Sequence, residues 1–238
     1  EEEPRQLTKD FKAMLYRPEW SPDNKRLALS DKDGKLYVLT LENNSVQEIA
    51  DDQFGGIGDY TWSPHGGYLA FSMSDWNGFN SIYIWSVADG QTRRITGPMF
   101  NERSPSWDPK GDFLFYLSDR EFAPQISTVE WNFAGNRNTG IFAMALRKEV
   151  TNPFEPESDE VKVDASEDDE GDEKDSKKKK DEKKADEEPA FMTVDFDGLA
   201  ERVVNIPVGF ENIRYLAAIE DHVIYAVTGA PFYGRSSN

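Results

Sequence analysis

Two histidines, His65 and His222, are the side chains in this sequence best suited to act as a general base. In a Ser-His-Asp triad the histidine is held between a nucleophile and an acid. His65 instead takes the place that Asp23 and Lys110 hold in two related segments, and His222 falls in the corresponding turn of a fourth segment. This equivalence is typical of solvent-facing turn residues. We therefore predict no catalytic residue in this chain.

The remaining polar motifs do not indicate a metal or a cofactor. The chain has no cysteine and no pair of histidines at metal-ligand spacing. The run Ser30-Asp31-Lys32-Asp33-Gly34 resembles the start of a calcium loop, but it lacks the further acidic ligands and stands where a hairpin turn is required. The run Gly55-Gly56-Ile57-Gly58 has the glycines of a phosphate cradle, but no lysine follows it and no helix start is apparent. We interpret the first run as a turn and the second as a connection between repeats.

A tryptophan followed by a proline turn recurs and shows how these turns are organised. The three tryptophans, Trp20, Trp62 and Trp107, lie 42 and then 45 residues apart, a period typical of repeat architectures. After each turn come an apolar run, a second run rich in aliphatic and aromatic residues, and an Asp-Gly or Asn-Asn turn before a last short strand. Glycine and asparagine suit such tight antiparallel hairpins because they tolerate a positive φ.

Each repeat therefore contains four short antiparallel strands, counting the strand that carries the tryptophan, and this is one blade of a β-propeller. We predict an all-β fold. The three tryptophans could line a binding groove, but their regular phase favours packing between neighbouring blades.

The two ends of the chain continue the same register. Residues 5–8 match residues 93–96, which predicts that the chain opens in the last strand of a blade. Residues 197–204 complete the third blade, and residues 214–227 start a fourth. The sequence thus predicts about three full blades and two partial ones, whereas a closed propeller needs roughly four to eight. We expect a piece of a longer polypeptide, whose open apolar faces favour a homo-oligomer.

Half of the net charge of −18 comes from one segment. Residues 155–188 contain 17 acidic and 8 basic residues and no aromatic residue. Such a composition cannot bury enough apolar surface to offset the entropy lost on ordering. We interpret residues 147–190 as a charged, mobile insertion within the third blade, between propeller residues 1–146 and 191–238.

Charge and hydropathy also limit the partners and the location. Nucleic acid is disfavoured, because the basic block Lys177-Lys178-Lys179-Lys180 is flanked by acidic residues and no basic face is evident. No apolar stretch approaches 18 residues, so we predict no membrane span. Since we expect the chain to begin within a domain, a signal peptide upstream stays open, and the lack of cysteine does not distinguish the cytosol from the periplasm.

The repeat resembles the TolB-type propeller repeat, which occurs in Tol-system proteins, prolyl-oligopeptidase relatives, some amidohydrolases and tricorn-like proteases. A second stretch is more selective. Residues 141–148, then Asn152-Pro153-Phe154-Glu155-Pro156, a charged insertion and residues 194–204 are similar to tricorn-like proteases. The resemblance covers nearly the whole chain, although its selective part lies in the third blade.

The resemblance to tricorn-like proteases implies a large modular serine peptidase whose propellers admit peptides and guide products. It implies peptides and the remaining domains of the parent protease as partners, and a cytoplasmic location with the periplasm left open. None of the family's catalytic elements has a matching position here, so activity would belong to the parent. Two alternatives remain: a TolB-like protein-binding scaffold, and the propeller cap of a prolyl-oligopeptidase-type α/β-hydrolase, which would require a Gly-x-Ser-x-Gly elbow downstream.

Overall fold

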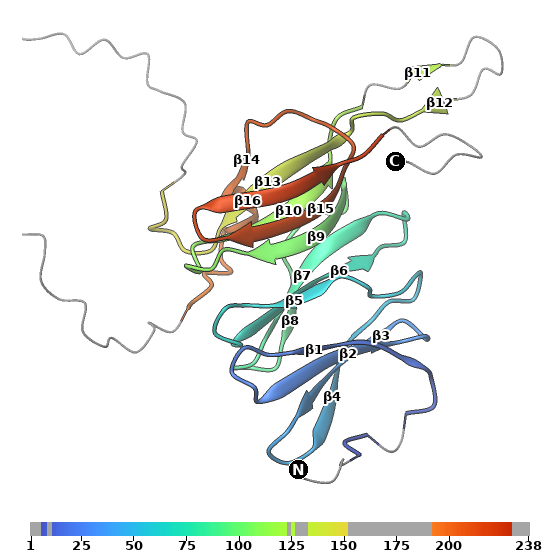
Figure 1. Ribbon diagram of the computed structural model, residues 1–238, viewed down its shortest axis with the longest axis vertical. Helices are drawn as coiled ribbons and strands as arrows, with labels where there is room; N and C mark the ends of the chain where they lie inside the picture. The colour runs from blue at the N-terminus through green and yellow to red at the C-terminus, as the bar shows by residue number, and fades with distance from the viewer. Residues whose placement is uncertain (1–5, 9–10, 123–124, 127–132, 152–191, 230–238) are drawn as a thin grey trace, which may run out of the picture. The chain divides into compact units, whose positions relative to one another are not determined.

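The computed structural model describes residues 6–8, 11–122, 125–126, 133–151 and 192–229. Over these residues the chain is almost entirely β-structure, and helix is limited to one 3₁₀ turn, η1 (Leu199–Glu201). The strands of the described residues form three four-stranded antiparallel sheets that follow one another along the chain (Figure 1). The predicted all-β fold is therefore confirmed.

Each sheet contains the strands of one repeat. The first sheet has the order β1-β2-β3-β4, the second β5-β6-β7-β8 and the third β14-β13-β10-β9. The bounds are β1 Leu15–Trp20, β2 Arg26–Asp31, β3 Lys35–Thr40, β4 Ser45–Asp51, β5 Tyr60–Trp62, β6 Tyr68–Ser74, β7 Asn80–Ser86, β8 Thr92–Arg94, β9 Asn101–Trp107, β10 Phe113–Asp119, β13 Thr139–Ala145 and β14 Val203–Asn205.

Two hairpins lie outside these sheets. β15 (Ile213–Ile219) pairs with β16 (His222–Val227) in a two-stranded sheet, and we refer to this hairpin as the fourth blade, because the sequence predicts the start of one there. β11 (Gln125–Ile126) pairs with β12 (Phe133–Ala134) in an excursion between β10 and β13. This second hairpin was not predicted, because the sequence pattern of the other two repeats contains only a short turn at that place.

The recurring tryptophan turns have one common geometry. Asn24, Gly66 and Gly111, each four residues after its tryptophan, have φ values of 55°, 67° and 75°. Their backbone N–H groups donate to the carbonyls of Ser21, Ser63 and Asp108 at 2.9 Å. Asparagine and glycine stand here because this left-handed conformation is accessible to them at little cost.

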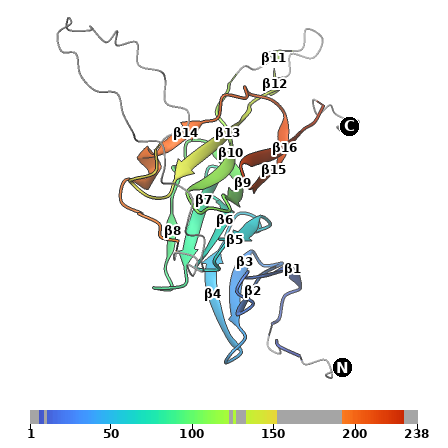
Figure 2. The same cartoon turned by 60° about the vertical axis from the view of Figure 1, so that its left-hand side comes forward.

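The core is formed between the sheets, because successive side chains of a strand point to opposite faces. Ala28, Leu36 and Val38 of the first sheet pack against Leu69, Phe71 and Trp85 of the second. Ala70, Ile82 and Ile84 on the other face of the second sheet pack against residues of the third, namely Leu114, Tyr116, Phe142 and Met144. Figure 2 shows the same order of sheets from another side. This face-to-face packing is that of neighbouring propeller blades.

The first sheet has one face that no other sheet covers within the described residues. Leu27, Leu29 and Leu39 on that face cluster with Leu7 and Phe11 of the N-terminal segment. Residues 6–8 form no strand, and residue 5 lies outside the described residues. The prediction that residues 5–8 form the last strand of a blade is therefore wrong for residues 6–8. The reason is physical: a strand needs a paired neighbour, and here the segment buries its apolar side chains against a sheet face instead.

The third sheet closes across a long interval of sequence. β13 ends at Ala145 and its partner β14 begins at Val203, with Ala143 opposite Val204. The two paired strands of the third sheet are thus separated by residues 146–202. The predicted mobility of the insertion concerns residues 152–191, which lie outside the described residues.

Because successive strands of a sheet run in opposite directions, their turns lie at two opposite ends of the sheet. The tryptophan turns and the β3–β4 and β7–β8 turns lie at one end, here called the turn rim. The β2–β3 and β6–β7 turns lie at the other end, together with the connections from one sheet to the next, residues 52–59 and 95–100. We call this second end the connection rim.

Candidate functional site

The first strands of neighbouring sheets are joined by hydrogen bonds from the repeated tryptophans. Trp62 Nε1 donates to the carbonyl of Glu19 at 3.1 Å, and Trp107 Nε1 donates to the carbonyl of Thr61 at 3.0 Å. Each acceptor directly precedes the tryptophan of the preceding sheet. Trp62 and Trp107 are both 5% exposed, so these two tryptophans pack between blades, as predicted.

The residues three positions before each tryptophan form a second row of contacts. These are Arg17, Asp59 and Ser104, here called the first-strand row. The Arg17 guanidinium donates to the carbonyl of Gly58 at 2.7 Å, and the Asp59 carboxylate accepts the Ser104 N–H at 2.7 Å. Asp59 also accepts the Ser72 hydroxyl. Adjacent first strands are thus tied through both side chains and backbone.

The backbone leaves regular pairing at this row. Arg17 and Ser104 have φ values of 44° and 55°, and the pairing registers of β1 with β2 and of β9 with β10 shift in the same regions. Such bulges bend a strand and re-aim its side chains. Positive φ at arginine and serine is uncommon, which makes these positions candidates for function.

Burial sets the electrostatics of the row. Desolvation raises the pKa of the Asp59 carboxyl, and the hydrogen bonds from Ser72 and Ser104 oppose that rise. Burial also raises the pKa of the Glu19 carboxyl, against the positive charge of Arg17. The row therefore combines the exposed guanidinium of Arg17 with the buried carboxyl group of Asp59, and Glu19 adds a second carboxyl group beside the row whose ionisation is disfavoured by burial.

A cavity with several polar side chains in its lining lies beside the β15–β16 hairpin. Its volume is about 380 Å³, and it is lined by Arg103, Thr139, Asn212, Ile213, Arg214, Tyr215 and Thr228. Arg103 is held by an ion pair of 2.8 Å with Asp119 and donates to the Thr139 hydroxyl at 3.1 Å. Arg214 is exposed, and Tyr215 is 72% exposed. Guanidinium, hydroxyl and phenol donors at this place can bind carbonyl oxygens of an extended peptide.

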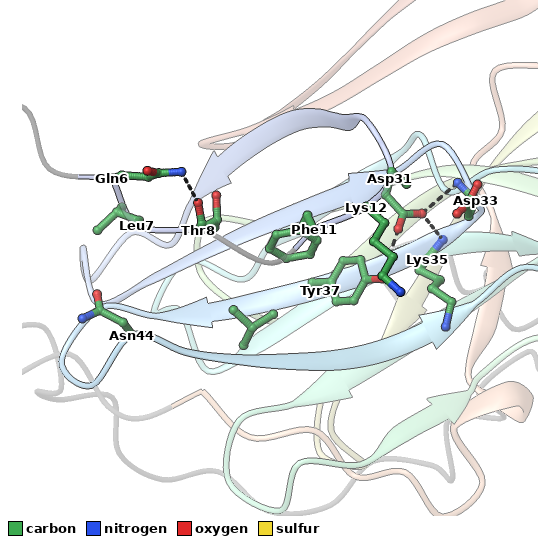
Figure 3. A pocket seen from close by; sticks show the side chains of 12 residues that line it. Gln6, Leu7, Thr8, Phe11, Lys12, Asp31, Asp33, Lys35, Tyr37 and Asn44 are labelled. Carbon is green, nitrogen blue, oxygen red and sulfur yellow. Dashed lines mark hydrogen bonds between the residues drawn. The ribbon is translucent and has the colours of Figure 1, made fainter.

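A larger cavity lies against the first sheet (Figure 3). It measures about 810 Å³ and lies between Gln6, Leu7 and Phe11 of the N-terminal segment and Asp31 and Tyr37 of the sheet. The Tyr37 hydroxyl donates to Asp31 at 3.0 Å, and its ring meets Phe11 edge-on at 4.9 Å. Burial, together with the bond to Asp31 and its negative charge, raises the pKa of Tyr37 to about 12.

The position of this larger cavity in the repeat identifies it as an interblade space. Its lining residues Leu7 and Phe11 pack in one cluster with Leu27 and Leu29, which stand seven and nine residues after Trp20. In the second sheet the matching residues, Leu69 and Phe71, pack against the preceding sheet. We therefore regard the cavity as a blade-packing face and the polar first-strand region as the candidate site.

The motifs weighed in the sequence lie apart from one another. His65 is in the β5–β6 turn, and His222, which is exposed, begins β16 and contacts the carbonyl of Glu220 at 3.0 Å. Asp31 closes the β2–β3 turn by accepting the N–H groups of Asp33 and Lys35 at 2.9 Å. Residues 55–58 connect β4 to β5. Both interpretations, as turn and as connection, are confirmed.

Two further features are lacking in the part of the chain that the structure describes. That part holds no group of three or more potential metal ligands. It also contains no helix that is long and apolar enough to span a membrane. The block of lysines at 177–180 lies outside it.

Sequence reasoning missed the first-strand row and Arg103. The phase of the repeat places Arg17, Asp59 and Ser104 at one position, and that phase was the available signal. Their chemical types differ, however, so no residue pattern marks the position. The contacts of Arg103 arise from β10 and β13, which are distant in sequence.

A family model and the related proteins point to the same family. The model of the tricorn protease second β-propeller domain matches residues 1–236. A tricorn protease homolog of Saccharolobus solfataricus is 26% identical over 219 residues, covering 92% of this chain and 18% of that protein. Tricorn protease homolog 1 of Streptomyces coelicolor is 25% identical and covers 86% of this chain and 18% of that protein.

The solved structures agree in fold. The crystal structure of the tricorn protease matches with a TM-score of 0.72 and 16% identity, over 94% of this chain and 20% of that one. At this identity the likeness concerns the fold, which confirms the predicted propeller. The chain spans about one fifth of the length of these relatives.

Proposed function

Because the chain belongs to the tricorn protease second β-propeller family, we propose that it is the non-catalytic propeller portion of a tricorn-like serine peptidase. In this role it guides or filters peptides for a catalytic core elsewhere in the polypeptide. Its partners are then peptides and the remaining domains of the parent, and its location is cytoplasmic. The open faces of the first and fourth blades favour self-association of the isolated chain.

The observation that carries this proposal is the contrast between the sheet faces and the first strands. The faces between the first and second sheets and between the second and third sheets are filled with buried apolar side chains, which disfavours passage of a peptide there. The first strands carry the exposed polar side chains of Arg17, Arg214 and Tyr215. A net hydrogen bond to such groups contributes only about 0.5–1.5 kcal/mol, which suits contacts that must form and release as a peptide moves.

The test compares three proteins: the isolated chain, the full-length polypeptide, and the full-length polypeptide with this propeller removed. We expect no peptide hydrolysis by the isolated chain, turnover by the full-length protein, and altered selectivity for peptide length after removal. A full-length protein without serine-peptidase activity would contradict the proposal.

Substitution of the two histidines provides the control for a catalytic contribution from this chain. His65→Ala and His222→Ala in the full-length protein should leave turnover unchanged, because His65 lies in the β5–β6 turn and His222 begins β16, in different blades. Cleavage by the isolated chain that either substitution abolishes would overturn the non-catalytic assignment.

A further inference from the structure

Three neighbouring loops on the connection rim expose large apolar side chains. Phe54 lies between β4 and β5, Trp76 and Phe79 lie in the β6–β7 hairpin, and Met99 lies between β8 and β9. Their exposed fractions are 65%, 78%, 43% and 73% in that order. We call these four residues the loop patch.

The four patch residues lie in short stretches that contain no charged residue. Residues 53–56, 76–79 and 97–100 contain no Asp, Glu, Lys or Arg, although these types make up 30% of the chain. On the turn rim, by contrast, the tryptophan turns carry the polar residues Asp23, His65 and Lys110. Loss of charge together with aromatic residues and methionine is the composition of the buried centre of a protein interface.

Hydrogen bonds hold the loops in place and join them to one another. The Asn77 side chain donates to the carbonyl of Pro98 at 2.7 Å, which links the hairpin of Trp76 to the loop of Met99. The buried Asp52 carboxylate accepts the N–H groups of Phe54 at 2.9 Å and Ser74 at 3.0 Å, which links the loop of Phe54 to the end of β6. The patch is thus preorganised, and a partner that covers it would lose little entropy in ordering it.

We propose that the loop patch docks a neighbouring folded domain of the same polypeptide through an apolar surface of that domain. The patch exposes on the order of 500 Å² of apolar side chain, from typical side-chain areas. A free partner in a stable complex usually covers about 800 Å² on each side. A tethered domain needs less, because its effective concentration is in the millimolar range.

The length of the relatives supports a tethered partner over a second copy. The chain covers 18% of the Saccharolobus solfataricus homolog, so most of that polypeptide lies outside the matched region. This inference concerns docking between domains and stands apart from peptide guidance, so either can fail without the other.

Methionine oxidation in the full-length polypeptide tests the docking. Hydrogen peroxide oxidises an exposed thioether much faster than a covered one, and mass spectrometry follows Met99 directly. The matched control is Glu42→Met, which places a methionine at an exposed turn on the turn rim. We expect Met99 to oxidise at least about fivefold more slowly than the control methionine, at every protein concentration. Buried Met144 provides the slow reference.

Each other outcome of the oxidation experiment overturns the proposal. Equal rates at Met99 and the control methionine would show an uncovered patch. Protection that disappears on dilution would assign the patch to a second copy of the chain, and protection that requires added peptide would assign it to substrate. Protection that persists when the other domains are removed would show that Met99 is covered locally.

Substitution of the patch provides a second readout. Trp76→Ser with Met99→Ser in the full-length polypeptide should leave unfolding of the propeller nearly unchanged, because both side chains are exposed. It should make the linker to the docked domain more sensitive to limited proteolysis, whereas Glu42→Ser should not. Unchanged proteolysis in the double variant would also contradict the proposal.

Discussion

The indole N–H of Trp107 donates to the backbone carbonyl of Thr61 at 3.0 Å, and this bond joins the third sheet to the second. Trp62 makes the matching bond to Glu19 at 3.1 Å. Trp20 holds the same place in the first sheet, where it is 53% exposed. The repeat therefore encodes one contact between blades, and Trp20 offers its side chain at the uncovered face.

Replacing a buried tryptophan of the repeat should lower the free energy of unfolding more than replacing the exposed one. Trp62→Phe removes a buried donor and leaves a small cavity, so we expect a loss of about 2 kcal/mol in the free energy of unfolding. Trp20→Phe should change it by less than about 0.5 kcal/mol. Urea titration measures both values, and equal losses would contradict the assigned role of the bond.

An ion pair between the buried Glu102 and the partly exposed Arg120 should be sensitive to loss of one partner. Glu102 is 2% exposed, and Arg120 contacts it at 3.0 Å while stacking over Phe142 at 4.0 Å. Arg120→Met should cost about 3–5 kcal/mol, because it leaves a buried carboxylate without its cation. The exposed pair of Arg137 and Glu211 provides the control.

The control substitution Arg137→Met should cost less than about 1 kcal/mol. Adding Glu102→Gln to Arg120→Met should recover part of the lost stability, since the uncompensated charge is then removed. If the double variant is as unstable as Arg120→Met, the cost comes from packing, and the electrostatic explanation is wrong.

The pKa of Asp89 should show whether the hydrogen bonds of the β7–β8 turn are formed. Its carboxylate accepts hydrogen bonds from Arg93 and from the N–H of Gln91, and these lower its pKa from 3.8 to about 2. A pKa that is lower in the folded state stabilises the fold above pH 3.8, and that contribution disappears as pH falls toward 2. NMR titration of Asp89 should give a midpoint near 2, and Arg93→Gln should raise it. A midpoint near 4 in the unsubstituted chain would contradict the contact.

The sequence predicted the three sheets because their alternation and their turns repeat in phase. It did not predict the β11–β12 hairpin, which occurs in one repeat alone. It missed the row of Arg17, Asp59 and Ser104 because positive φ at arginine and serine is set by tertiary contacts and not by residue preference. Asp59 illustrates the same limit, since Ser104 donates to its carboxylate across 45 residues of sequence.

The charged insertion should be dispensable for folding. Residues 155–188 lack aromatic residues and have few apolar ones, so they offer almost nothing to a core. Replacing them with a short Gly-Ser linker should change Tm by less than about 2 °C. The control is a segment with the length and composition of residues 155–188 but with its sequence scrambled. A fall in Tm of many degrees on replacement by the Gly-Ser linker would show that the segment packs.

The central claim is that the polar first strands guide peptides, and the most direct measurement is kcat/KM of the full-length polypeptide across peptides of increasing length. Arg214→Ala with Tyr215→Ser should change the ratio of kcat/KM between long and short peptides by about tenfold, which corresponds to one or two net hydrogen bonds. The exposed Lys25→Ala should leave that ratio unchanged. An unchanged ratio in the double variant, with its propeller still folded, would contradict the account.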